Sequence, residues 1–101
     1  MKAQYIYDKG TDSLAIFTGR RTHASVELGG EIIVDLDSKN NVTGVEILNP
    51  DKLFKLTKKS LEKIDHASLT SVNRGGLTWI YLALRMGEIE KQTQIPLAVA
   101  A

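Results

Sequence analysis

The sequence contains no cysteine, which excludes disulfide bridges, thiolate nucleophiles and thiolate-rich zinc sites. It also lacks any run near the roughly 20 apolar residues that span a bilayer. Its amino terminus becomes polar before an apolar signal segment develops. We therefore expect a cytoplasmic protein that does not enter the membrane.

An excess of charge of one sign is lacking as well. Thirteen basic and twelve acidic residues leave a formal net charge of +1, so no strong field attracts nucleic acid or an anionic membrane. The composition, 43% hydrophobic and 25% charged, is typical of a globular protein. A chain of 101 residues removes roughly 65% of its unfolded surface from water on folding, which suffices for one core. We expect a single domain spanning residues 1–101.

The clearest structural pattern lies in residues 32–48, IIVDLDSKNNVTGVEIL. Two alternating apolar runs flank the turn-forming SKNN, which predicts a β-hairpin. Asn49 and Pro50 follow as a helix N-cap and first helical residue. Apolar residues at near-helical spacing then predict one helix, or two short helices divided near Thr57, with an exposed lysine face.

Strand patterns occupy most of the remaining chain. In the first half they cover residues 3–7, 13–18 and 25–28, and after the helix they form a meander through the segments SLTSVN, LTWIYLALR and EIEKQTQIPL. Pro96 in the last segment indicates a strand near a sheet edge. The predicted fold is α+β: an antiparallel sheet of about seven or eight short strands with one helical segment after the fifth strand. Hairpins and helix occupy residues 1–66, and the meander occupies residues 67–101.

The first half resembles domain of unknown function 2283, a group of small prokaryotic proteins. The matching elements, in order, are Tyr7-Asp8, Asp12-Ser13-Leu14, the strand at residues 32–37 and the GVEIL strand at residues 44–48. The resemblance implies a small antiparallel sheet followed by a helix, without an established activity or catalytic residues. Because some relatives are suspected partners of small toxin-like proteins, it also suggests an antitoxin-like role.

Three carboxylates in the hairpin form a candidate metal site. We expect Asp35, Asp37 and Glu46 to lie on the same side, where they could bind a hard cation such as magnesium or calcium. The segment DLDSKN lacks the glycine and terminal glutamate of an EF-hand loop. Acidic turn residues on a solvated strand are the alternative interpretation.

Basic residues form a second candidate site. Arg20, Arg21 and His23 cluster in one segment, and Lys55, Lys58, Lys59 and Lys63 lie on the predicted helix. Together they could line a groove for nucleic acid or a small anionic ligand. The alternative is an ordinary solvated face, because lysines alternating with apolar residues are what an amphipathic helix requires.

No catalytic arrangement is apparent. His23 and His66 are the two histidines, and neither has a partner at a recognisable spacing. No serine lies in a nucleophile-elbow pattern, and the glycine pairs do not form a phosphate-binding loop. The sequence predicts no cofactor and no catalytic residue.

Two aromatic residues form the candidate interface. Trp79 and Tyr81 share one face of a strand whose other face is also apolar, so something must cover them. The cover is either the helix after Pro50 within the monomer or a partner chain.

We therefore expect a non-enzymatic interaction module, a self-associating subunit with a dimer favoured or an antitoxin-like partner of a second small protein. The alternatives are an anion or nucleic-acid binder using Arg20, Arg21 and the helix lysines, and a metal-assisted hydrolase using Asp35, Asp37 and Glu46.

Overall fold

The computed structural model describes residues 2–98. It contains eight strands and two short helices, in agreement with the α+β prediction. The strands of the first half are β1 (Lys2–Asp8), β2 (Ser13–Phe17), β3 (Ala24–Leu28), β4 (Ile32–Leu36) and β5 (Val42–Leu48). The helices α1 (Pro50–Phe54) and α2 (Lys58–Leu61) come next, followed by β6 (His66–Arg74), β7 (Leu77–Met86) and β8 (Ile89–Ala98).

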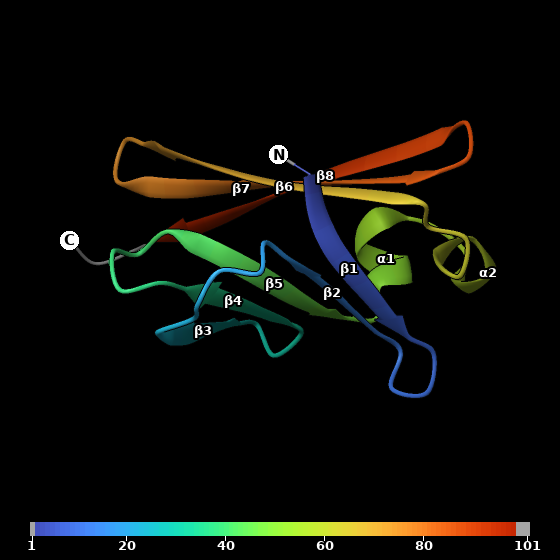
Figure 1. Ribbon diagram of the computed structural model, residues 1–101, viewed down its shortest axis with the longest axis horizontal. Coiled ribbons are helices and arrows are strands. Elements are labelled where there is room, and N and C mark those ends of the chain that lie inside the picture. Colours follow the sequence, from blue (N-terminus) through green and yellow to red (C-terminus); the bar gives the residue numbers. More distant parts are fainter. Residues whose placement is uncertain (1, 99–101) are drawn as a thin grey trace.

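The strands form one antiparallel sheet in the order β3-β4-β5-β2-β1-β6-β7-β8. The sheet curls at β1, which pairs with β6 at Lys2 and Ala3 and then with β2 from Gln4 to Asp8. Figure 1 shows β6, β7 and β8 across one side of the molecule and β2 to β5 across the other, with α1 and α2 at one end. The apolar inner faces of the two halves therefore pack against each other.

The hairpin predicted at residues 32–48 is confirmed. Strands β4 and β5 pair antiparallel, and the register shifts between Asp35 and Leu36. In the turn, the backbone N–H of Asn40 donates to the carbonyl oxygen of Asp37, 3.1 Å away. Asn40 adopts a positive φ of 63°, a conformation that asparagine tolerates better than most residues.

The helical segment divides near Thr57, as one of the two sequence alternatives predicted. Pro50 begins α1, but the side chain of Asn49 makes no capping hydrogen bond, because its backbone lies in the left-handed region. The expected asparagine cap is therefore wrong in its chemistry, although its position is correct. The capping side chain is that of Thr57, which accepts a hydrogen bond from the backbone N–H of Ser60, 3.1 Å away.

The core lies between the two halves of the curled sheet and is closed at one end by the helices. Its fully buried side chains include Leu14, Ile16, Val34, Val45 and Ile47 from one half and Ile80, Leu82, Leu84 and Leu97 from the other. The helical segment contributes Phe54, Leu61 and Ile64.

Candidate functional site

The outer face of β6, β7 and β8 carries the predicted interface residues. Trp79 lies in register with Val72 of β6 on one side and Pro96 of β8 on the other. Tyr81 occupies the same central column, in register with Thr70 and Gln94. Both rings are half-buried, so each keeps part of its surface in water.

This face is hollowed beside Tyr81. The hollow has a volume of about 610 Å³. Its lining residues are all uncharged: Ser68, Thr70, Tyr81, Leu82, Ala83, Gln92, Thr93 and Gln94. A shallow, uncharged surface around an aromatic ring is typical of places where protein side chains dock.

The helices do not cover this face. Strand alternation turns Ile80, Leu82 and Leu84 inward, where they share a core with Phe54 and Leu61 of the helical segment. The helices therefore pack on the opposite side of the strand from Trp79 and Tyr81. The sequence left two covers for Trp79 and Tyr81 open, the helical segment and a partner chain. The helical segment is not the cover, because it packs against the other apolar face of β7.

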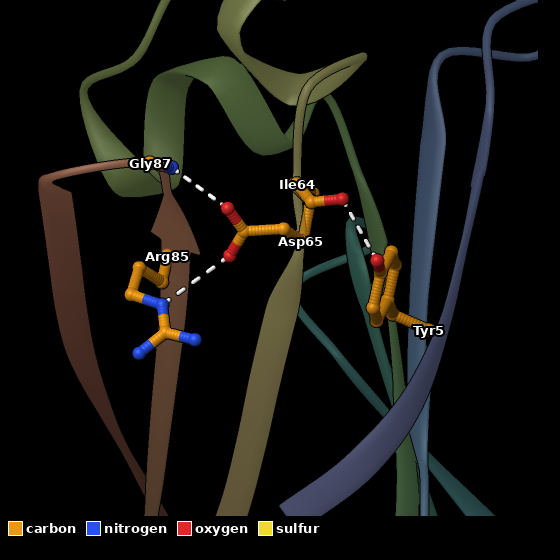
Figure 2. A network of polar contacts seen from close by, with 5 residues as sticks. All are labelled: Tyr5, Ile64, Asp65, Arg85 and Gly87. Carbon is orange, nitrogen blue, oxygen red and sulfur yellow. Dashed lines mark hydrogen bonds and ion pairs between the residues drawn. The ribbon is translucent and has the colours of Figure 1, made fainter.

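Charged residues lie at one end of the outer face, beside the turn between β7 and β8. Asp65 accepts hydrogen bonds from the Gly87 backbone N–H at 2.9 Å and from Arg85 Nε at 3.3 Å (Figure 2). The Gly87 N–H, assisted by Arg85, holds the pKa of the Asp65 carboxyl below its ordinary value. His66, the next residue, is half-buried at the start of β6.

The predicted basic cluster does lie together in part. Arg20, Arg21 and His23 line a second hollow of about 510 Å³, together with Thr22, Asp37 and Ser38. The segment that carries them is fastened to its surroundings: the backbone N–H of His23 donates to the carbonyl oxygen of Leu36 at 2.7 Å, and the Thr22 and Thr43 hydroxyls lie 3.1 Å apart.

The lysines of the helical segment do not join this cluster. Lys58 and Lys59 belong to α2, which lies at the other end of the molecule from the segment between β2 and β3 (Figure 1). The Lys58 ammonium instead pairs with Asp12 Oδ2 at 3.2 Å. The predicted groove lined by both sets is therefore wrong, because the two segments attach to opposite ends of the sheet.

The three hairpin carboxylates do not form a metal site. Asp35 accepts a hydrogen bond from the Ser25 hydroxyl at 2.7 Å, and Glu46 is exposed on β5. The Asp37 side chain lies in the turn between β4 and β5, where a hydrogen bond from the backbone N–H of Asn41 lowers the pKa of the Asp37 carboxyl. Over residues 2–98 no group of three or more histidine, aspartate or glutamate side chains is placed to hold a metal ion. The predicted convergence fails because Asp37 lies beyond the end of β4, in the turn, where its carboxylate accepts hydrogen bonds from the backbone N–H groups of Lys39 and Asn41.

The polar cluster around Tyr7 was not predicted from the sequence. The Tyr7 hydroxyl donates to Asp12 Oδ1 at 3.1 Å, while Asp12 also meets Lys58. Burial, together with the Asp12 carboxylate, raises the pKa of the Tyr7 hydroxyl. Asp51 Oδ1 is buried nearby without a hydrogen-bond partner. The sequence signal available for this cluster was the spacing of Tyr7 and Asp12 in the family pattern. The two residues lie where the first hairpin meets the helical segment.

No helix within residues 2–98 has both the length and the apolar character to cross a membrane.

Comparison with known proteins gives a family and a relative. A family described as "Protein of unknown function (DUF2283)" matches residues 4–49, a segment that contains most of β1 and all of β2 to β5. The "Uncharacterized protein MJ0789" of Methanocaldococcus jannaschii is 31% identical to this chain in an alignment that covers 94% of this chain and 86% of the relative. That similarity therefore extends through the meander. No solved structure matches the chain. On these grounds the chain belongs to the DUF2283 family of proteins of unknown function.

Proposed function

We propose that this chain is a non-enzymatic interaction module of the cytoplasm that forms a homodimer through the outer face of β6, β7 and β8. Trp79 and Tyr81 are its central interface residues. The cysteine-free composition supports the cytoplasmic location, because it suits a reducing compartment.

The observation that carries the proposal is the position of Trp79. It stands in the middle strand of the three, with the uncharged residues Val72 and Pro96 beside it and a further aromatic ring at Tyr81. Large aromatic side chains contribute much of the binding energy where they are buried at the centre of an interface. Val72 is itself 38% exposed, so apolar surface continues from the tryptophan onto β6.

The charge pattern favours a second copy as the partner. In a two-fold dimer the same patch meets itself, so a charge at the centre would approach a like charge. Here the centre is uncharged, and Arg74, Arg85 and Glu90 stand toward its ends.

Light scattering during size-exclusion chromatography tests this proposal. The wild-type chain is expected to have twice the monomer mass of 11.1 kDa, and Gln94→Lys to have the monomer mass, because the added charges would meet across the axis. The matched control is Gln4→Lys, the same change at an exposed site on β1 in the other half of the sheet; it should remain dimeric.

A monomeric wild-type chain at all concentrations would contradict the homodimer. The alternative is then an antitoxin-like module that binds a different small protein through the same face. A pull-down from the source cell, with wild type beside Gln94→Lys and Gln4→Lys, would support it if one stoichiometric protein were lost with Gln94→Lys only.

A further inference from the structure

Arg20 lies between two hollows. The first is the basic hollow of about 510 Å³ described above, which Arg21, His23 and Ser38 also line. The second has a volume of about 240 Å³, an apolar floor from Val42 and Leu69, and polar side chains from Thr18, Asn41 and Ser71. Because Arg20 lines both hollows, the two are adjacent, and together they are termed the composite cavity.

The second hollow arises from the way the sheet divides. Strand β1 pairs with β6 at Lys2 and Ala3 and with β2 from Gln4 onward. Near this divergence the end of β2 at Thr18, the start of β5 at Val42 and the β6 residues Leu69 and Ser71 surround a space. The hollow is therefore built by the topology of the fold.

The basic hollow carries an excess of cationic groups: Arg20 and Arg21 share it with one carboxylate, Asp37, which interacts electrostatically with Arg20. Neither Arg20 nor Arg21 forms an ion pair with any residue in the described part of the chain. The nearby carboxylate, Asp37, is already engaged: its Oδ1 accepts the N–H groups of Lys39 and Asn41, and its Oδ2 accepts Asn41 Nδ2. Guanidinium groups in this situation favour phosphate, which accepts paired hydrogen bonds from them.

The backbone that carries the arginines is held in place. The backbone N–H of Arg20 donates to Thr18 Oγ1 at 3.2 Å, and that of Thr18 donates to the carbonyl oxygen of Thr43 at 2.9 Å. Thr22 and His23 are tied to β5 and β4 by the contacts given above. A ligand therefore meets a segment whose backbone is already ordered, which reduces the entropy lost on binding.

We propose that this composite cavity binds a small phosphomonoester with a hydroxyl-bearing body. Its phosphate lies against Arg20, Arg21 and His23, and its body occupies the hollow lined by Asn41 and Ser71. The two hollows together fall within the roughly 300–1,000 Å³ of small-molecule sites. A nucleic-acid backbone is disfavoured, because Lys58 and Lys59 lie at the other end of the molecule and do not extend the basic surface.

Titration of the ¹⁵N-labelled chain tests the proposal, with inorganic phosphate, ribose 5-phosphate, adenosine 5′-monophosphate and adenosine as probes. The three phosphate-containing probes should shift the amide signals of Arg21 and His23, and the two phosphomonoesters should in addition shift that of Ser71. Adenosine should bind at least about tenfold more weakly than its monophosphate, since it lacks the group that the arginines recognise. No shift with any phosphate probe at millimolar concentration, or equal affinity for adenosine and its monophosphate, would overturn the proposal.

Substitutions at three exposed positions, two in the cavity and one outside it, test the two parts of the cavity independently. Arg21→Gln should weaken all phosphate probes by about tenfold or more, whereas Arg74→Gln, the same change outside the cavity, should leave affinity unchanged. Ser71→Gln adds bulk to the second hollow and should weaken the two phosphomonoesters while sparing inorganic phosphate. Equal losses for Arg21→Gln and Arg74→Gln would identify general charge attraction and contradict the site. None of these results depends on whether the chain is a dimer.

Discussion

Tyr5 donates a hydrogen bond from its hydroxyl to the carbonyl oxygen of Ile64, 2.7 Å away and 59 positions further along the chain (Figure 2). Tyr5 belongs to β1, and Ile64 closes the helical segment just before β6 begins. Two residues later the chain enters the sheet that carries Trp79. This hydrogen bond therefore anchors the end of the helical segment to β1, immediately before the chain enters β6.

Tyr5→Phe should lower the free energy of unfolding by about 1 kcal/mol, because the Ile64 carbonyl loses its donor in a partly buried position. Urea denaturation of both proteins measures this difference. Tyr81→Phe is the matched control and should change stability by less than about 0.5 kcal/mol, since its hydroxyl has no acceptor within residues 2–98 and the ring is partly exposed. Equal losses in the two variants would contradict a specific role for the Tyr5 hydroxyl.

The two cap positions of the helical segment should respond differently. Thr57→Ala removes the acceptor for the Ser60 N–H and should cost about 1 kcal/mol of unfolding free energy. Asn49→Gly should change it by less than about 0.5 kcal/mol, because the Asn49 side chain caps nothing and its left-handed backbone, with φ of 52°, suits glycine. Thermal unfolding followed by circular dichroism compares them, and a larger loss for Asn49→Gly would show that the asparagine side chain caps α1 after all.

The contribution of Asp65 to stability should depend on pH. Its pKa is lowered in the folded state, chiefly by the Gly87 N–H, so the folded chain holds this proton less readily than the unfolded chain. The stabilising contribution is therefore present above the unfolded pKa and is lost as the pH falls through the folded pKa. Asp65→Asn should destabilise the chain at neutral pH, and the difference from wild type should shrink below about pH 4. A difference that stayed constant between neutral and acidic pH would rule out this linkage.

Gly44 should be intolerant of a side chain. A Cβ there would lie 3.1 Å from Phe17 Cβ and 3.4 Å from the carbonyl oxygen of Ile16, inside the packed contact of β5 with β2. Gly44→Ala should therefore cost about 1–3 kcal/mol of unfolding free energy. Gly10→Ala is the control, because an added Cβ meets only the side-chain carboxylate of Asp8, 3.2 Å away, in an exposed turn with no packed backbone beside it. If both variants lost the same stability, crowding at Gly44 would not be the cause.

The strand pattern was predictable from the sequence where burial alternates along a strand, as it does in β2 and β7. Ile80 and Leu82 point into the core while Trp79 and Tyr81 point out, as the period of two required. The alternation could not show which apolar face the helices would cover. That choice depends on the way the sheet curls at β1, which is set by pairing between residues more than sixty positions apart, such as Ala3 and Ala67.

The candidate sites were less predictable because local spacing does not fix tertiary position. Arg20, Arg21 and His23 are neighbours in the chain and remain together in one hollow. Lys58 and Lys59 were grouped with them by charge alone, and the fold separates the two groups. Asp37 was assigned to the face of Asp35 by counting residues, but β4 ends at Leu36, and the Asp37 carboxylate instead accepts hydrogen bonds from the backbone N–H groups of Lys39 and Asn41 in the turn.

Fluorescence of Trp79, the one tryptophan in the sequence, tests the proposed homodimer most directly. Emission wavelength and acrylamide quenching are measured while the wild-type chain is diluted from high micromolar to nanomolar concentration. The proposal predicts a red shift and stronger quenching on dilution, as the ring moves from the interface into water, and a concentration-independent, red-shifted spectrum for Gln94→Lys. A wild-type spectrum that does not change with concentration and equals that of Gln94→Lys would contradict burial of Trp79 between two copies of the chain.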